Sequence, residues 1–308
     1  MNLSHIGFRA TRREIKRENP DMSPQVSFEF FPPKTLEAAF RLHDTVQTLA
    51  PYGPRFVSVT YGAGGTTRAL TREAAQTLHK TTGLRVAAHL TCVGASRDET
   101  LDVARGYAGT GITDIVALRG DAEEGAERFT PHASGFANSV ELIEALAAEG
   151  QFNIKVGAYP ERHPDAAHEN ADIDWLKAKL DAGASEAITQ FFFDPEDFLR
   201  FRDKCAAAGI DKPITPGFLP IENWQSTKRF SAKCGASIPA ALDDAFAKAA
   251  RDGREELLAI AQATELCDAL LCEGVEDLHF YTLNRPELTA KICTALGLEA
   301  RAPLRNVA

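Results

Sequence analysis

The sequence predicts an α/β protein in which eight strands close into a (β/α)8 TIM barrel, with extra helices between the seventh and eighth strands. Two observations predict this fold: short β-rich runs alternate with helix-length amphipathic segments, and these runs number eight. Strands that alternate with helices pair in parallel through right-handed crossovers. A count of eight favours a closed barrel over an open doubly wound sheet.

The first strand is expected at residues 25–31. There Val26, Phe28 and Phe30 alternate with Ser27 and Glu29, which is the period-2 pattern of a strand, and a Pro-Pro pair follows at once. The other strands are expected at residues 56–61, 85–91, 114–119, 154–159, 187–192, 214–219 and 278–283.

The segments between the strands have the pattern of amphipathic helices. Residues 35–50 place Leu36, Phe40 and Val46 on one apolar stripe. Similar helices are expected at 68–82, 97–108, 134–149, 172–182 and 195–208, and at 223–233, 239–251 and 255–272 in the long stretch after the seventh strand. We therefore expect one barrel domain at residues 25–300, with a leader at 1–24 that lacks a signal-peptide core and a tail at 301–308.

The composition limits the classes of function. A net charge of -9 over 308 residues argues against a nucleic-acid binder, which needs a basic face. No apolar run approaches the length of a membrane span. The six cysteines are scattered and form no CxxC pair, which favours reduced thiols in a cytoplasmic protein.

Polar residues gather at the expected C-terminal ends of seven of the eight strands, where barrel enzymes carry their chemistry. They are Glu29, Thr60 with Tyr61, His89 with Thr91, Arg119 with Asp121, Tyr159 with His163, Gln190, and Tyr281 with Arg285. Such a concentration at one rim predicts an active site there.

Glu29 is the most unusual of these residues, because it stands among phenylalanines. Burial disfavours the charged carboxylate and raises its pKa, so Glu29 is expected to keep a proton near neutral pH and to donate it to a substrate. The alternative is a solvent-facing residue on an edge strand.

Other rim features have ordinary alternatives. The glycine-rich run at 62–65 could be a loose turn, and His89 could be a hydrogen-bonded core residue. His163, Asp165 and His168 could suggest a metal, but the chain has no strong ligand spacing such as HExxH, and no metal is expected. A GxSxG nucleophile elbow is also missing.

These segments together resemble the methylenetetrahydrofolate reductase family, in its short bacterial form, over roughly residues 26–296. The matching segments are SFEFFPPK at 27–34, VTYGAGG at 59–65, HLTC at 89–92, ALRGD at 117–121, AYPERHP at 158–164, ITQFF at 188–192, PGFLP at 216–220 and HFYTLNR at 279–285. Eight motifs in order, each at an expected strand end, make the resemblance specific.

The resemblance implies a barrel that holds FAD non-covalently. It implies that hydride passes from NADH or NADPH to the flavin and then to 5,10-methylenetetrahydrofolate, in ping-pong order, giving 5-methyltetrahydrofolate for methionine synthesis. It also favours a homo-oligomer. Because the chain stops soon after Leu298, inhibition through the C-terminal regulatory domain of the longer eukaryotic enzymes is not expected.

The resemblance also implies roles for individual residues. Glu29 matches the general acid and Asp121 a carboxylate near flavin and pterin, while Gln190, Phe230 and Arg285 match substrate-binding positions. The matching flavin-binding positions are Thr60, His89, Arg119, Gly120, Asp121, Ala133, Tyr159, His163, Asp172 and Lys179.

Three positions depart from the family pattern. Trp175 and Ala178 stand where bacterial relatives often place polar flavin contacts, and Ser226 stands where a glutamine often reaches the substrate.

Three other functions are possible beside the reductase: a related flavin barrel with another substrate, a pterin-binding barrel that binds or transfers a one-carbon unit without flavin, and a barrel kept as a scaffold. The intact polar rim argues against the scaffold.

Overall fold

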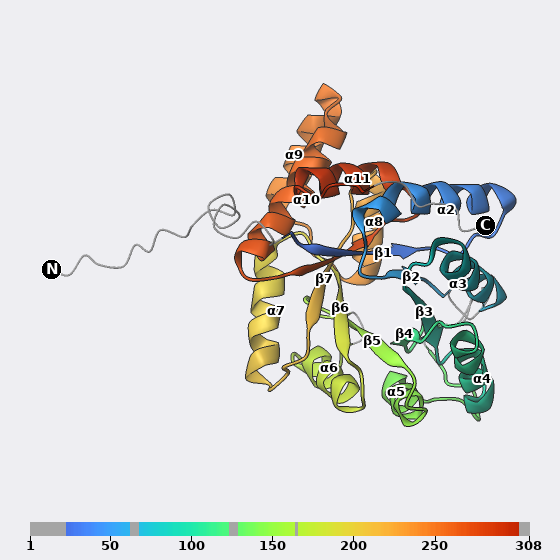
Figure 1. Cartoon of the computed structure of the whole chain (residues 1–308). Helices are drawn as coiled ribbons and strands as arrows, with labels where there is room; N and C mark the ends of the chain where they lie inside the picture. Colours follow the sequence, from blue (N-terminus) through green and yellow to red (C-terminus); the bar gives the residue numbers. More distant parts are fainter. Residues whose placement is uncertain (1–22, 62–67, 123–128, 164–165, 302–308) are drawn as a thin grey trace.

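Eight parallel strands pair in sequence order, and the eighth pairs with the first, which closes the predicted barrel (Figure 1). The computed structural model describes residues 23–61, 68–122, 129–163 and 166–301. The strands are β1 (Gln25–Phe30), β2 (Val57–Val59), β3 (Val86–Thr91), β4 (Asp114–Leu118), β5 (Asn153–Ala158), β6 (Glu186–Phe191), β7 (Ile214–Phe218) and β8 (Asp277–Tyr281). The expected leader, the glycine-rich run at 62–65 and nearly all of the tail lie outside the described residues.

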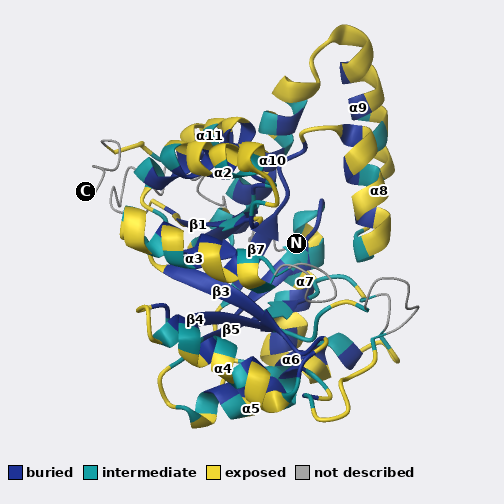
Figure 2. Ribbon diagram, turned by 90° about the vertical axis from the view of Figure 1, so that its right-hand side faces the viewer, coloured by how far each residue is buried: buried dark blue, intermediate teal, exposed yellow. Residues whose placement is uncertain are grey.

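Helices surround the barrel, with their exposed residues on the outer faces and the buried strands at the centre (Figure 2). They are α2 (Leu36–Leu49), η1 (Ala50–Tyr52), α3 (Arg68–Thr82), α4 (Arg97–Ala108), α5 (Ser139–Ala148), α6 (Ala171–Asp181), α7 (Pro195–Ala207), α8 (Trp224–Cys234), α9 (Ala240–Asp252), α10 (Glu255–Cys272) and α11 (Pro286–Ala295). Within the described residues, no helix is both long and apolar enough to cross a membrane.

The structure corrects two expected elements. The helix predicted from residue 134 begins only at Ser139, because the Asn138 side chain accepts hydrogen bonds from the backbone N–H groups of Val140 (2.9 Å) and Glu141 (3.2 Å) and so caps the helix there. The helix α11 was not predicted, although it buries Leu288 and Ile292 against the core.

A layer of charged side chains fills the N-terminal end of the barrel. Lys155 is buried, hydrogen-bonds Glu186 and lies 3.2 Å from an oxygen of Asp114. Arg55 contacts Glu186 at 2.5 Å, and Arg85 donates to Asp114 at 2.7 Å. Every member of this layer thus faces an opposite charge, as buried ionic groups require.

An apolar layer separates these charges from the C-terminal end of the barrel. Its residues are Phe56, Ala87, Val116 and Ile188, which form a cluster of their own apart from the larger core. The ammonium of Lys155 lies 4.6 Å from the centre of the Phe56 ring, and the His279 ring stacks on Phe56 at 5.8 Å. Phe56 therefore contacts Lys155 of the charged layer on one side and the buried His279 on the other.

Candidate active site

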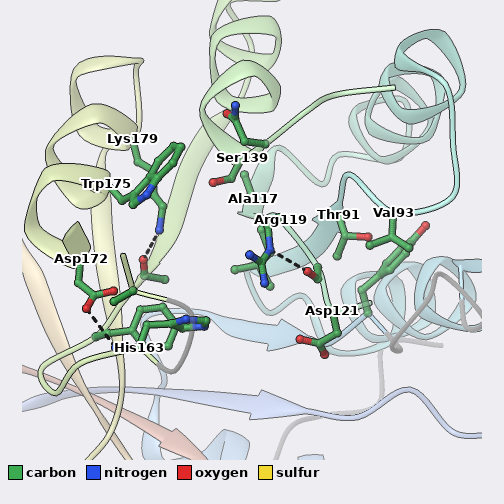
Figure 3. A pocket seen from close by; sticks show the side chains of 17 residues that line it. Thr91, Val93, Ala117, Arg119, Asp121, Ser139, His163, Asp172, Trp175 and Lys179 are labelled. Carbon is green, nitrogen blue, oxygen red and sulfur yellow. Dashed lines mark hydrogen bonds between the residues drawn. The ribbon is translucent and has the colours of Figure 1, made fainter. Parts of the chain in front are cut away.

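A cavity of about 430 Å³ opens at the C-terminal ends of β3, β4 and β5 and is walled on one side by α6 (Figure 3). Seven of the ten predicted flavin positions line it: Arg119, Gly120, Asp121, Tyr159, His163, Asp172 and Lys179. The barrel thus brings together residues from three segments of the chain that were selected on sequence alone.

Two cations stand in this cavity. Lys179 donates to the Gly157 carbonyl oxygen at 2.9 Å, and burial lowers the pKa of its ammonium to about 8, although the charge of Asp172 opposes this shift. The Arg119 guanidinium donates to the Gly120 carbonyl oxygen at 3.3 Å and lies over the Phe129 ring. Two cations in one cavity are suited to a phosphate or diphosphate group.

Local geometry fixes the other polar groups of the wall. The Asp172 carboxylate accepts a hydrogen bond of 3.0 Å from the His163 backbone N–H, which ties the loop after β5 to α6. The Tyr159 and His163 rings meet edge to face at 4.5 Å. Burial, reinforced by the Asp121 charge, raises the pKa of Tyr159 to about 12. Tyr159 is therefore a neutral hydrogen-bonding group at physiological pH.

Gly120 explains how the chain turns at the end of β4. Its φ is +87°, and a Cβ atom there would lie 2.4 Å from a methyl carbon of Val93 and 3.0 Å from Cβ of Thr91. Only glycine accepts both the left-handed backbone and the close approach. Gly120 thus sets the direction of Asp121, whose exposed side chain projects from the rim.

Glu29 lies on the inner face of the barrel beside two histidines. Its Oε2 atom is 3.2 Å from His89 Nε2, 3.8 Å from His279 Nε2 and 3.4 Å from Ser58 Oγ. His279 is fully buried, and its Nδ1 atom is 2.7 Å from Ser27 Oγ. Parallel pairing explains this cluster, because β1 lies between β2 and β8 and aligns Glu29 with Ser58, and Ser27 with His279.

The histidines reverse the expected pKa of Glu29. Burial raises the pKa of the carboxyl group, as anticipated, but the charge of His89 and the hydrogen-bonding contribution of both imidazoles outweigh burial and lower the pKa to about 2. The expectation that Glu29 alone keeps a proton near neutral pH is therefore wrong. Glu29, His89 and His279 therefore form one cluster of side chains inside the barrel.

The predicted substrate positions lie at the same end of the barrel but outside the cavity lining. Gln190 is half-buried at the end of β6, and its side-chain oxygen accepts from the Phe191 backbone N–H at 3.0 Å. The Phe230 ring, 41% exposed on α8, stacks on Phe191 at 5.3 Å. Arg285 precedes α11 and is exposed.

Three predicted flavin positions do not line the cavity. His89 instead contacts Glu29, Thr60 is tied through its backbone to Phe30, and Ala133 is exposed in the loop before α5. Several cavity residues were not singled out from the sequence, among them Val93, Asn138 and Ser139. Asn138 carried a usable signal, because a polar residue directly before a helix is a cap that faces the same end of the barrel.

Comparisons with known proteins agree with this arrangement. The family model for methylenetetrahydrofolate reductase matches residues 14–297. The 5,10-methylenetetrahydrofolate reductase of Salmonella typhimurium is 43% identical over 295 residues, covering 94% of this chain and 98% of the relative. The Escherichia coli (strain K12) protein of that name is 44% identical over 274 residues, covering 89% and 90%.

The fold also recurs in solved structures. An uncharacterized protein from Clostridium thermocellum that binds two copies of 5-methyl-5,6,7,8-tetrahydrofolic acid superposes with a TM-score of 0.58 at 14% identity, covering 94% of this chain and 98% of that one. This distant likeness concerns the fold alone, whereas the bacterial relatives match nearly end to end. From the sequence match over the whole barrel and its polar rim, the chain belongs to the methylenetetrahydrofolate reductase family.

Proposed function

We propose that this protein reduces 5,10-methylenetetrahydrofolate to 5-methyltetrahydrofolate with NADH or NADPH, through non-covalently held FAD in ping-pong order, and so supplies methyl groups for methionine synthesis. The observation that carries the proposal is the buried Glu29 cluster at the mouth of a barrel whose rim also holds two cations, in a chain of this family. We also expect a cytoplasmic homo-oligomer, which stays a prediction.

The cavity wall fits a flavin dinucleotide. Arg119 and Lys179 supply two positive charges for a diphosphate, and the glycine backbone at residue 120 leaves room for a ligand beside it. Bound FAD would supply the hydride relay between the nicotinamide and the folate. The contribution of the protein is to hold the ring system at the rim near Asp121 and Tyr159 and to keep water away from it.

The folate step consumes one proton together with the hydride, because a carbon–nitrogen bond of the methylene bridge opens and the bridge carbon becomes a methyl group. The cluster of Glu29, His89 and His279 holds this proton, and Glu29 delivers it to the folate nitrogen. Asp121 is exposed at the rim and accepts hydrogen bonds from the pterin. Gln190 and Phe230 position the rings, and Arg285 binds the glutamate tail.

An anaerobic titration tests the proposal. Purified protein is expected to be yellow, NADH or NADPH should bleach it, and 5,10-methylenetetrahydrofolate should restore the colour. Comparison of the two nucleotides in the same titration identifies the preferred donor. A colourless protein that takes up no added FAD would overturn the redox proposal. A flavin that bleaches but is not reoxidised by the folate would favour a related flavin barrel with a different substrate.

Replacement of Asp121 with asparagine is expected to weaken folate binding and turnover while FAD stays bound. The side chain points out from the rim, and loss of a charged hydrogen-bond acceptor costs about 1.5–3 kcal/mol, or roughly 10- to 150-fold in folate affinity. The measurements are the folate Kd of the oxidised enzyme and the flavin content after gel filtration. Asp174→Asn, on the exposed side of α6, is the matched control. Loss of flavin as the main effect would reassign Asp121 to cofactor binding.

A further inference from the structure

We propose that the indole of Trp175 stacks on the adenine ring of FAD, so that this residue selects the dinucleotide over flavins that lack adenine. The inference rests on the proposed FAD dependence and adds a residue that the family pattern does not supply. Trp175 lines the cavity and is 49% exposed, although its helix neighbours Ile173 and Leu176 are buried. A large apolar ring half open to water on a cavity wall is costly unless a ligand covers it.

Trp175 shares one face of α6 with the polar residues of the site. Asp172, Trp175 and Lys179 are spaced three and four residues apart, which puts them on the same side of a helix, and all three line the cavity. Figure 3 shows Trp175 and Lys179 projecting together from α6 into the space that Arg119 enters from the opposite wall. The aromatic ring therefore stands directly beside a cation of the candidate diphosphate site.

The other tryptophan of the chain has a different environment. Trp224 is buried, stacks on Phe246 at 4.4 Å, and donates its indole N–H to Asp243 at 2.7 Å. Among the described residues, the close ring–ring and cation–ring contacts include Trp224 but not Trp175. Trp224 has a structural role that its contacts explain, whereas the ring of Trp175 has no such partner within the part of the chain that the structure describes.

The chemistry of the wall orients the ligand. In bound FAD, a diphosphate held between Arg119 and Lys179 would join the flavin part of the cofactor to its adenosine part. These two parts extend from the diphosphate in different directions. One direction leads to Asp121 at the rim, where the reactive ring is expected, and the other leads along α6 to Trp175. A flat heterocycle on this second arm meets an aromatic face, and stacking of a base on an aromatic side chain contributes about 1–3 kcal/mol.

Binding of FAD and FMN to the apoprotein tests the inference by calorimetry or flavin fluorescence. Trp175→Ala is expected to weaken FAD binding by about 5- to 150-fold, the factor that corresponds to the stacking energy. FMN binding should be unchanged, because FMN lacks the adenine ring. Trp175→Phe, which retains an aromatic face, should recover most of the FAD affinity.

Phe40→Ala removes another exposed aromatic ring, one that does not line the cavity, and is the matched control, with no expected change for either flavin. Equal weakening of FAD and FMN in Trp175→Ala, or no weakening of FAD, would overturn the role of Trp175. A change in oligomeric state with unchanged FAD affinity would assign the ring to a subunit contact instead. A wild-type protein that binds no flavin would overturn the proposed cofactor itself and, with it, this inference.

Discussion

Replacement of Glu29 with glutamine is expected to slow the folate half-reaction by about 10²- to 10⁴-fold, the usual contribution of general acid catalysis, and to leave flavin reduction by the nicotinamide largely intact. The reason is that only the folate half-reaction needs a proton from the protein. Glutamine keeps the shape of the side chain but cannot transfer a proton. Stopped-flow measurement of each half-reaction, at 450 nm under anaerobic conditions, separates the two effects.

The same substitution at the surface provides the control. Glu37 pairs with Arg41 on the exposed side of α2, so Glu37→Gln should leave both half-reactions unchanged. Equal losses in both half-reactions would mean that Glu29 holds the barrel interior together and does not donate the proton.

Replacement of Lys155 with methionine is expected to lower the free energy of unfolding by about 3–5 kcal/mol, because it leaves two buried carboxylates without their central cation. Asp114 and Glu186 are 4% and 5% exposed, so water cannot replace the lost ammonium. Urea unfolding at pH 7 measures the effect. Lys177→Met, which removes a surface pair with Asp181, should cost only about 0.5 kcal/mol or less.

The pH dependence of this destabilisation follows from the signs of the pKa shifts. Burial raises the pKa of Asp114 and Glu186, but the surrounding cations outweigh burial and lower both below their ordinary values of 3.8 and 4.5. A lowered folded-state pKa contributes stability that is present above the ordinary value and is lost as the pH falls through the folded-state value.

The difference in unfolding free energy between wild type and Lys155→Met should therefore shrink as the pH falls below about 4.5. At such pH the carboxylates of the variant can take up protons, which removes the cost of leaving them unpaired. Paired urea titrations between neutral and acidic pH provide the measurement. A difference that stays constant over this range would show that Lys155 stabilises the barrel by packing and not by charge.

The barrel could be predicted from the sequence because its strands and helices have local patterns. Each strand was recognised within a few residues, since period-2 and period-3.6 patterns depend only on neighbouring positions. The boundaries depend on longer contacts: β2 stops at Val59, where Thr60 turns to bond its N–H to the Phe30 carbonyl at 2.9 Å. The helix α11 begins without a side-chain cap, so only Pro286 at its first position marked the start, and that signal was overlooked.

The site was predictable in its location but not in its electrostatics. The rule that barrel chemistry lies at strand ends pointed to the end of the barrel where the cavity opens, and the resemblance added its residues on α6, Asp172 and Lys179. The pKa of Glu29 was misjudged because it depends on His89 and His279, which lie on other strands and reach the carboxylate only after the barrel closes. His89, which the resemblance assigns to the flavin, contacts Glu29, and its flavin role stays a prediction. Local sequence indicates burial, but not which charges will share the buried space.

The ring of Phe56 separates two groups of buried charges that serve different purposes. On one side Lys155 pairs with the buried carboxylates, and on the other His279 lies 3.8 Å from Glu29, the proposed acid. The apolar layer around Phe56 thus keeps the stabilising ion pairs of the barrel apart from the proposed catalytic residues. Replacement of Lys155, Asp114 and Glu186 together by well-packed apolar residues is therefore expected to raise the thermal stability of the barrel without changing the pKa of Glu29.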